Sequence, residues 1–265
     1  MKNWDIHIYR GILTGYNDAF IISEDKKNEI LLNCLDENER RRTAEIIRPI
    51  LRGRDIKRYE YSFADLYLIN THNGVKENGT VKKTRIDIKD YPAVKKHLDE
   101  YWDKIATRAD KGDTPYNLRN CAYMDEFNKP KIVWAELSRT GNSFVLDEAK
   151  MYLGNTGYIL TAKNDDLKTL KYLLGFLNSR VVLYYLDLIC TRFDDNGWRW
   201  LRQFVEDIPI PQISSDNCSE LVEIVGKANK QNQKNLSSKI NEIVAEKYGL
   251  TLEELSFINS YLHKY

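Results

Sequence analysis

The sequence predicts an α+β fold, in which a mixed region of strands and helices is followed by a helical segment at the carboxyl end. Three observations support this. Short apolar runs bounded by turn residues fill residues 5–162, helical apolar spacing begins at residue 167, and the composition changes after Pro211. With 265 residues, 42% of them hydrophobic, the chain can bury a sizeable core. We therefore predict two domains, over residues 1–212 and 213–265.

The predicted strands are short runs rich in β-branched and aromatic residues. DIHIY (5–9) and AFIIS (19–23) are expected to form a strand pair, joined by a turn that contains Gly11 and Gly15. The same composition predicts further strands over residues 66–72, 131–137, 143–147 and 157–162. Several of these lie at hairpin spacing, which favours a largely antiparallel arrangement.

Predicted helices lie between and after these strands. Asp36 can cap a helix over residues 36–48, with Glu39 at the capping-box position and Pro49 ending it. A second helix is expected to open at Pro92, because apolar residues recur at helical spacing through Ile105. Both are expected to be packing helices.

From Leu167 an apolar stripe advances by alternate steps of three and four, as on a helix facing a core. Ser179 is placed to cap a second helix, so the chain is expected to turn there. Beyond residue 212, helical segments alternate with polar links, and Gly249 and the Thr251–Glu254 pair are placed as C-cap and capping box. These features predict the terminal helical domain.

Composition limits the function classes. The net charge of +1 argues against a simple polyanion-coating protein, but residues 39–58 hold eight Lys or Arg against three acids. Four dispersed cysteines without a CxxC pair argue against a zinc site or disulfide framework, and 17 tyrosines suit a recognition surface. Without an apolar leader or membrane-spanning run, a cytoplasmic protein with no membrane contact is predicted.

Catalytic motifs are not found in the sequence. The four histidines lack metal-binding spacing, and neither a GxSxG elbow, a P-loop nor an NPPY-like methyltransferase loop occurs. Asp87 with Lys89 and Asp125 with Lys129 are loose nuclease-like pairs, of a kind expected by chance among 39 acids. No catalytic residue and no metal ligand is therefore predicted.

Two basic segments instead indicate recognition of a polyanion. In LRGRDIKRY, Arg52 and Arg54 flank Gly53, so that two guanidinium groups are expected to project from a turn. In residues 191–204, arginines alternate with Trp198 and Trp200, a combination that suits a nucleic-acid groove. At least one of the two tryptophans is nevertheless expected to be part of the core.

The order of these stretches resembles the TaqI-like specificity domain, the carboxy-terminal target-recognition part of adenine-specific DNA methyltransferases and of fused type IIG restriction-modification enzymes. The resemblance covers most of residues 6–212. It rests on IYRGILTGYNDAFIIS, IIRPILRGRDIKRY, YLINTHNG, YPAVKKHLDEYWDKIATRAD, PKIVWAEL, YILTAKNDDLKTLKYLLGFLNSRVVLYYL and VEDIPIPQI, in that order. LNS followed by IPIP is also similar to type I specificity subunits, and KINEIVAEKYGLTLEEL resembles the helical ending of fused enzymes.

The resemblance implies a domain that docks on double-stranded DNA and reads a short site. S-adenosylmethionine and Mg²⁺ are then expected only in separate catalytic domains of the same polypeptide or of a partner subunit, and this chain is expected to be a fragment or a split subunit. Phosphate contacts are expected from Arg52, Arg54, Lys57 and Arg58. Base-reading candidates are Tyr16, Asn17, Arg139, Asn142, Arg192, Asn196 and Arg199.

Two other interpretations stay open. The terminal helices, with apolar residues from Leu221 to Val244, are compatible with a protein-interaction module that docks on a catalytic methyltransferase or restriction subunit. A free-standing nuclease or methyltransferase is the other alternative, which the missing motifs make the weaker one.

Overall fold

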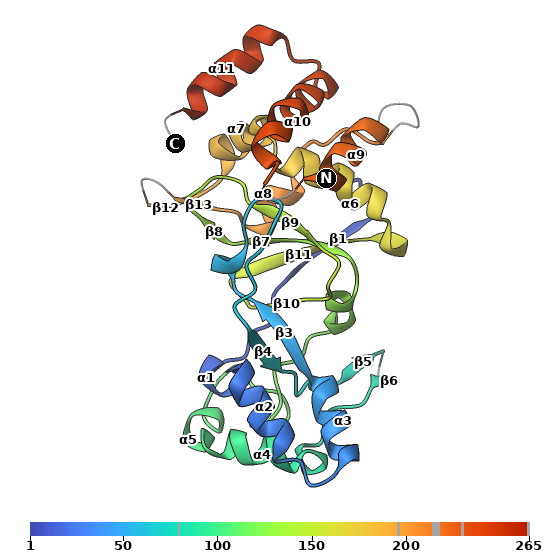
Figure 1. Ribbon diagram of the computed structural model, residues 1–265, viewed down its shortest axis with the longest axis vertical. Helices are drawn as coiled ribbons and strands as arrows, with labels where there is room; N and C mark the ends of the chain where they lie inside the picture. Colours follow the sequence, from blue (N-terminus) through green and yellow to red (C-terminus); the bar gives the residue numbers. More distant parts are fainter. Residues whose placement is uncertain (79, 195–196, 214–217, 229–230, 264–265) are drawn as a thin grey trace.

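The computed structural model describes residues 1–78, 80–194, 197–213, 218–228 and 231–263. Figure 1 shows an elongated molecule in which helices α6–α11 lie at one end and helices α1–α5 at the other, with sheets between them. The chain therefore mixes helices and strands as predicted, and the α+β fold class is confirmed.

The central sheet is antiparallel and has the strand order β1–β11–β7–β9. Its strands are β1 (Ile6–Arg10), β11 (Gly157–Ala162), β7 (Lys131–Ala135) and β9 (Phe144–Asp147). Alternate residues of β7 enter different cores, because Ile132 and Trp134 pack toward the α6 side while Val133 packs toward the α1–α5 side. The sheet thus has an apolar core on each face.

The second sheet has the order β10–β3–β4–β2 and supports the α1–α5 end of the molecule (Figure 1). It consists of β10 (Tyr152–Leu153), β3 (Ile47–Leu51), β4 (Leu66–Ile69) and β2 (Ile21–Ser23). Around it lie α1 (Asn17–Phe20), α2 (Glu24–Leu32), α3 (Glu37–Ile46), α4 (Pro92–Asp99) and α5 (Trp102–Ile105). Asp36 caps α3 as predicted, whereas the Glu39 carboxylate accepts from the backbone of Leu35 and Ala93.

The expected strand pair at the amino end is wrong. β1 pairs with β11 and β2 pairs with β4, so the two strands belong to different sheets. The GILTGY segment is a crossing between the sheets, and Ile12 bridges Gly154 in parallel. Only glycine fits at position 11, since an added Cβ would lie 2.0 Å from the Gly154 carbonyl oxygen.

Short ribbons and 3₁₀ turns complete the sheet region. One ribbon joins β8 (Leu137–Ser138), β12 (Arg192–Asp194) and β13 (Gly197–Arg199), and a separate hairpin pairs β5 (Val75–Glu77) with β6 (Thr80–Lys83). The 3₁₀ turns are η1 (Gly53–Asp55), η2 (Ile88–Asp90), η3 (Met124–Asn128) and η4 (Lys163–Asp165). Trp198 and Trp200 are buried, which confirms that tryptophans of this segment belong to the core.

The helical end comprises α6 (Leu167–Leu177), α7 (Arg180–Ile189), α8 (Arg202–Glu206), α9 (Ser219–Lys227), α10 (Gln233–Lys247) and α11 (Leu252–Leu262). Ser179 caps α7, and Thr251 with Glu254 forms the predicted capping box of α11. Leu221, Ile240 and Val244 are buried in the same core as α6, so this apolar stripe packs within its own chain. The domain boundary at residue 212 stays a prediction.

No single helix in the described part of the chain combines the length and apolarity needed to cross a membrane. Helices α6 and α7 meet that requirement only as a pair, and the chain bends by 68° between them.

A buried ion pair ties two strands of the central sheet together. Lys131 on β7 donates through Nζ to Asp147 Oδ2 on β9 and to the Phe127 carbonyl oxygen, at 2.5 and 2.7 Å. Asp147 also accepts from the Tyr61 hydroxyl and the Met151 backbone. Burial lowers the pKa of Lys131, while the Asp147 carboxylate opposes that shift. Both side chains are fully buried, so each depends on the other for compensation of its charge.

Candidate nucleic-acid interface

A cleft of about 510 Å³ opens where the two larger sheets meet. The end of β1, turn η1, the residues between β7 and β8, and the loop between β10 and β11 contribute to its wall. Its polar lining side chains are Arg10, Asn17, Arg52, Arg54, Glu136, Asn155 and Thr156.

Glu136 is the centre of an ion-pair cluster in this cleft. Its Oε2 accepts from Arg10 Nη2 at 2.9 Å, and its Oε1 lies 3.2 Å from Arg199 Nε. The backbone is fixed as well, because Glu136 donates to the Thr156 carbonyl and accepts from the Trp200 amide, each at 2.8 Å. The Glu136 side chain is only 11% exposed, against 55% for Arg10 and 45% for Arg199. A nearly buried carboxylate therefore orients two guanidinium groups that reach solvent.

The expectation that Arg52 projects as a free guanidinium is wrong. Its Nη2 and Nε donate to the two carboxylate oxygens of Asp55, at 2.7 and 3.0 Å, and this bidentate pair closes turn η1. Burial raises the pKa of Asp55, but the hydrogen bonds from the Arg52 side chain and backbone outweigh it, and the net shift is downward. Arg52 lines the cleft as a partner of Asp55.

The other predicted phosphate ligands divide into two groups. Arg54 and Lys57 are exposed, and Arg54 lines the cleft. Arg58 is half-buried and donates to the carbonyl oxygen of Asn178 at the carboxyl end of α6, where a cation is favoured. Arg58 thus joins the sheet to the α6–α7 corner, and its assignment as a phosphate ligand stays a prediction.

The predicted base-reading residues also differ in whether their side chains are buried or exposed. Asn142 is buried and donates to the carbonyl oxygens of Leu177 and Ser179 at 2.6 and 2.8 Å. It holds the α6–α7 corner, so its assignment as a base reader is corrected. Asn17 is exposed at the cleft, and its Oδ1 accepts from Thr14 at 2.6 Å. Tyr16 is half-buried, with its ring 6.1 Å from that of Tyr101.

Arg139 and Arg192 lie on or beside the β8–β12–β13 ribbon. Arg139 is exposed, pairs with Asp194 and lies over the Phe193 ring at 5.1 Å. Arg192 pairs with the buried Asp187 and lies over Trp198 at 4.9 Å, so it is the less accessible of the two. Asn196 lies outside the residues that the structure describes.

Asn17 and Arg54 thus line one cleft, and Arg199 is joined to it through its ion pair with Glu136, whereas Asn142 and Arg58 bond backbone carbonyl oxygens at the α6–α7 corner. Sequence reasoning missed Arg10 and Glu136. Their signal was positional, because each is a charged residue directly at the end of an apolar strand, next to a glycine or a short second strand. Among the described residues, no group of three or more His, Cys, Asp or Glu could hold a metal ion.

Comparison with known proteins agrees with this architecture. The family model of the TaqI-like C-terminal specificity domain matches residues 48–210, more than half of the chain. The chain belongs to this family.

Two solved structures share the TaqI-like domain's fold. The type IIL restriction-modification enzyme MmeI in complex with DNA is similar with a TM-score of 0.66 at 12% identity, over 96% of this chain and 35% of that chain. The type IIG restriction endonuclease BpuSI is similar with a TM-score of 0.53 at 14% identity, over 93% of this chain and 31% of that chain. The chain thus spans about a third of each of these proteins, and the resemblance expected from sequence is confirmed.

Proposed function

We propose that this TaqI-like domain reads a short sequence in double-stranded DNA, as the specificity region of a type II restriction-modification enzyme of the IIG kind or of an adenine-N6 DNA methyltransferase. The observation that supports this most is the arginine-lined cleft in a chain of a specificity family. The charged lining residues and their ion-pair partners are four guanidinium groups and two carboxylates, for a net charge of +2. That charge attracts the phosphate backbone.

Within the cleft, the side chains suit two tasks. Arg54 is exposed and close to Lys57 in sequence, and such cations hold phosphates, which set the position of the protein on the duplex. Arg10 and Arg199 are held by Glu136, and a fixed guanidinium fits the two acceptors of guanine. Asn17 offers an amide of the type that pairs with adenine.

Methylation and cleavage, with S-adenosylmethionine and Mg²⁺, are proposed to belong to other domains. The supporting observations are that the chain spans about a third of MmeI and BpuSI, and that its described residues hold no metal-ligand cluster. The MmeI structure is a complex with DNA, which supports DNA as the ligand proposed for this chain.

The test is selection from a randomised duplex pool at low salt, followed by sequencing of the bound fraction. We expect a short enriched site. Arg199→Ala is expected to lose preference at one base pair, because a bidentate contact discriminates by about 1–3 kcal/mol. Arg202→Ala is the matched control, since Arg202 also pairs with an acid at the surface, 2.8 Å from Glu206, but outside the cleft. If Arg199→Ala selects the same consensus sequence as the parent, Arg199 does not read a base pair.

Docking on a catalytic partner is a second candidate function. Leu188 on α7 and Leu252 and Phe257 on α11 are exposed apolar side chains at the helical end. Titration with non-specific DNA at two salt concentrations separates the two functions, because a docking module without a DNA interface shows no salt-dependent binding.

A further inference from the structure

Two smaller hollows lie between the cleft and the β5–β6 hairpin. A hollow of about 350 Å³ shares Arg10 and Asn155 with the cleft. A third hollow, of about 170 Å³, shares Asn120 and Cys121 with the second and reaches Val75, the first residue of β5. Because each hollow shares lining residues with the next, the three lie in a row from the cleft to the base of the hairpin, and we call this row the trough.

Cations follow this trough. Arg119 lines the second hollow and is 60% exposed. From residue 80 to residue 85 the sequence is TVKKTR, with three cations and no acid. In this segment Lys82 and Arg85 are exposed, as is the apolar Val81. The hairpin therefore presents positive charge to solvent at the end of the trough.

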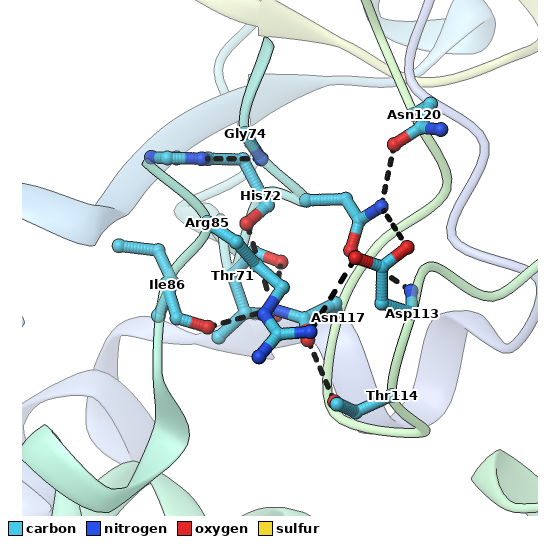
Figure 2. Close-up of polar contacts among 10 residues, drawn as sticks. Thr71, His72, Gly74, Arg85, Ile86, Asp113, Thr114, Asn117 and Asn120 are labelled. Carbon is cyan, nitrogen blue, oxygen red and sulfur yellow. Dashed lines mark hydrogen bonds and ion pairs between the residues drawn. The ribbon is translucent and has the colours of Figure 1, made fainter. Parts of the chain in front are cut away.

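The base of the hairpin is fixed on one side by Asn73. Its Nδ2 donates to Asp113 Oδ1 at 2.9 Å and to Asn120 Oδ1 at 2.5 Å, and its Oδ1 accepts from the Asp113 backbone at 2.9 Å. Arg85 Nη1 lies 3.4 Å from Asp113 Oδ2. Figure 2 shows Asp113 between Arg85 and Asn120.

A second set of bonds joins the two ends of the hairpin. Asn117 Nδ2 donates to the Ile86 carbonyl oxygen at 2.9 Å, and the Ile86 amide donates to the His72 carbonyl oxygen at 3.1 Å (Figure 2). Gly74 has a φ of +74°, and an added Cβ would lie 2.5 Å from the Lys83 carbonyl oxygen. Only glycine allows the two strands to approach here.

An isolated two-stranded hairpin is marginally stable in water, and β6 buries little apolar surface. The side-chain network at its base offsets the entropy cost of holding the ribbon in one direction. The described residues of the positively charged β5–β6 hairpin thus belong to neither apolar core.

We propose that the β5–β6 hairpin, with Arg119, is a second DNA contact, which binds the sugar-phosphate backbone outside the base pairs that the cleft reads. This inference rests on the proposed function. A two-stranded ribbon is narrow enough to lie along a DNA groove, and the trough leads to it directly from the cleft.

Surface ion pairs do not prevent this contact. Lys83 lies 3.0 Å from Asp125, and Arg119 lies 3.1 Å from Asp110. Exposed pairs of this kind stabilise a protein by about 0–1 kcal/mol, so a phosphate oxygen can replace the carboxylate. Removing the cation and removing the acid should consequently have opposite effects on DNA binding.

The test compares the selected duplex with long flanks and the same site trimmed to the enriched base pairs, across a range of salt. Lys83→Ala and Arg119→Ala are each expected to reduce the slope of log K against log [salt] by about 0.9 on the long duplex. Raising salt from about 50 to about 200 mM should then weaken each variant about 3.5-fold less than the parent. Asp125→Asn should bind the long duplex more tightly, and none of the variants should differ from the parent on the trimmed duplex.

Lys239→Ala and Glu220→Gln are the matched controls, because they remove a surface pair of 3.2 Å in the helical end. They should bind both duplexes like the parent. If the parent binds DNA and Lys83→Ala, Arg119→Ala and Asp125→Asn all match it on the long duplex, the hairpin inference is overturned while the proposed function stands. If the parent binds neither duplex at any salt concentration, the proposed function fails first.

Discussion

Arg52 and Arg54 are separated by a single residue in sequence, and the structure predicts opposite consequences for their removal. Arg52 closes turn η1 through two hydrogen bonds to Asp55, whereas Arg54 is exposed at the cleft. We therefore expect Arg52→Ala to lower stability with little effect on DNA affinity, and Arg54→Ala to lower DNA affinity with little effect on stability.

The magnitudes follow from the contacts. A hydrogen bond to a charged group contributes about 1.5–3 kcal/mol, and solvent screening reduces this because the Arg52 side chain is 31% exposed. Asp55 keeps its bond from the Arg52 backbone amide, at 2.8 Å. We expect Arg52→Ala to cost about 1–2 kcal/mol, which lowers Tm by about 2–8 °C in a chain of this size. Loss of one phosphate contact in Arg54→Ala should reduce the salt slope by about 0.9.

Thermal unfolding and salt titration of DNA binding, measured on both variants and the parent, decide between the two roles. Lys57→Ala is a useful companion, since it tests whether an exposed cation near the cleft also contributes to the slope. An unchanged Tm together with a reduced salt slope for Arg52→Ala would refute the reasoning, because the guanidinium would then be free to bind phosphate.

Three further results are expected. Lys131→Met should lower the free energy of unfolding by about 3–5 kcal/mol in denaturant titration, because it leaves the Asp147 carboxylate buried without a cation. Burial lowers the pKa of His97, so the unfolded chain binds more protons than the folded chain. The free energy of unfolding should therefore fall as the pH drops below about 6.5, and His97 should contribute at most about 1.4 kcal/mol per pH unit to this fall. In His97→Gln the free energy of unfolding should fall less over the same pH range. Glu136→Gln should raise affinity for scrambled DNA while reducing preference for the selected site, measured as the ratio of the two Kd values, because Arg10 and Arg199 lose the charge that orients them.

Local signals in the sequence were sufficient for most elements of the fold. The caps at Asp36, Ser179 and Thr251 each depend on residues within one helical turn, and the structure contains all three. Pairing of strands was harder to predict, because β1 and β2 are close in sequence but pair with β11 and β4. Nothing within residues 5–23 specifies a partner more than a hundred residues away.

The site was predictable in residue type and less so in residue role. Sequence shows that Arg52, Arg54 and Arg58 are cations within one seven-residue stretch, but only the fold shows that Asp55 and the Asn178 carbonyl bind two of them. Asn142 was assigned from its place in a loop, yet the α6–α7 corner supplies two carbonyl oxygens for its amide. Loop position alone therefore does not separate a polar side chain that faces solvent from one that satisfies buried backbone groups.

The pairing of arginines with carboxylates helps to separate cations that suit base reading from cations that suit phosphate contact. An arginine already held by Glu136 loses part of its rotamer freedom on folding, so less entropy is lost when it meets a base. Base edges require donors in fixed positions, whereas phosphates accept a cation from many directions. Arg10 and Arg199 therefore suit base reading, and the exposed Arg54 and Lys57 suit phosphate contact. Under the proposed function, a cation held by the nearly buried Glu136 is suited to base reading. A cation that is exposed, or paired with a carboxylate only at the surface, is suited to phosphate contact.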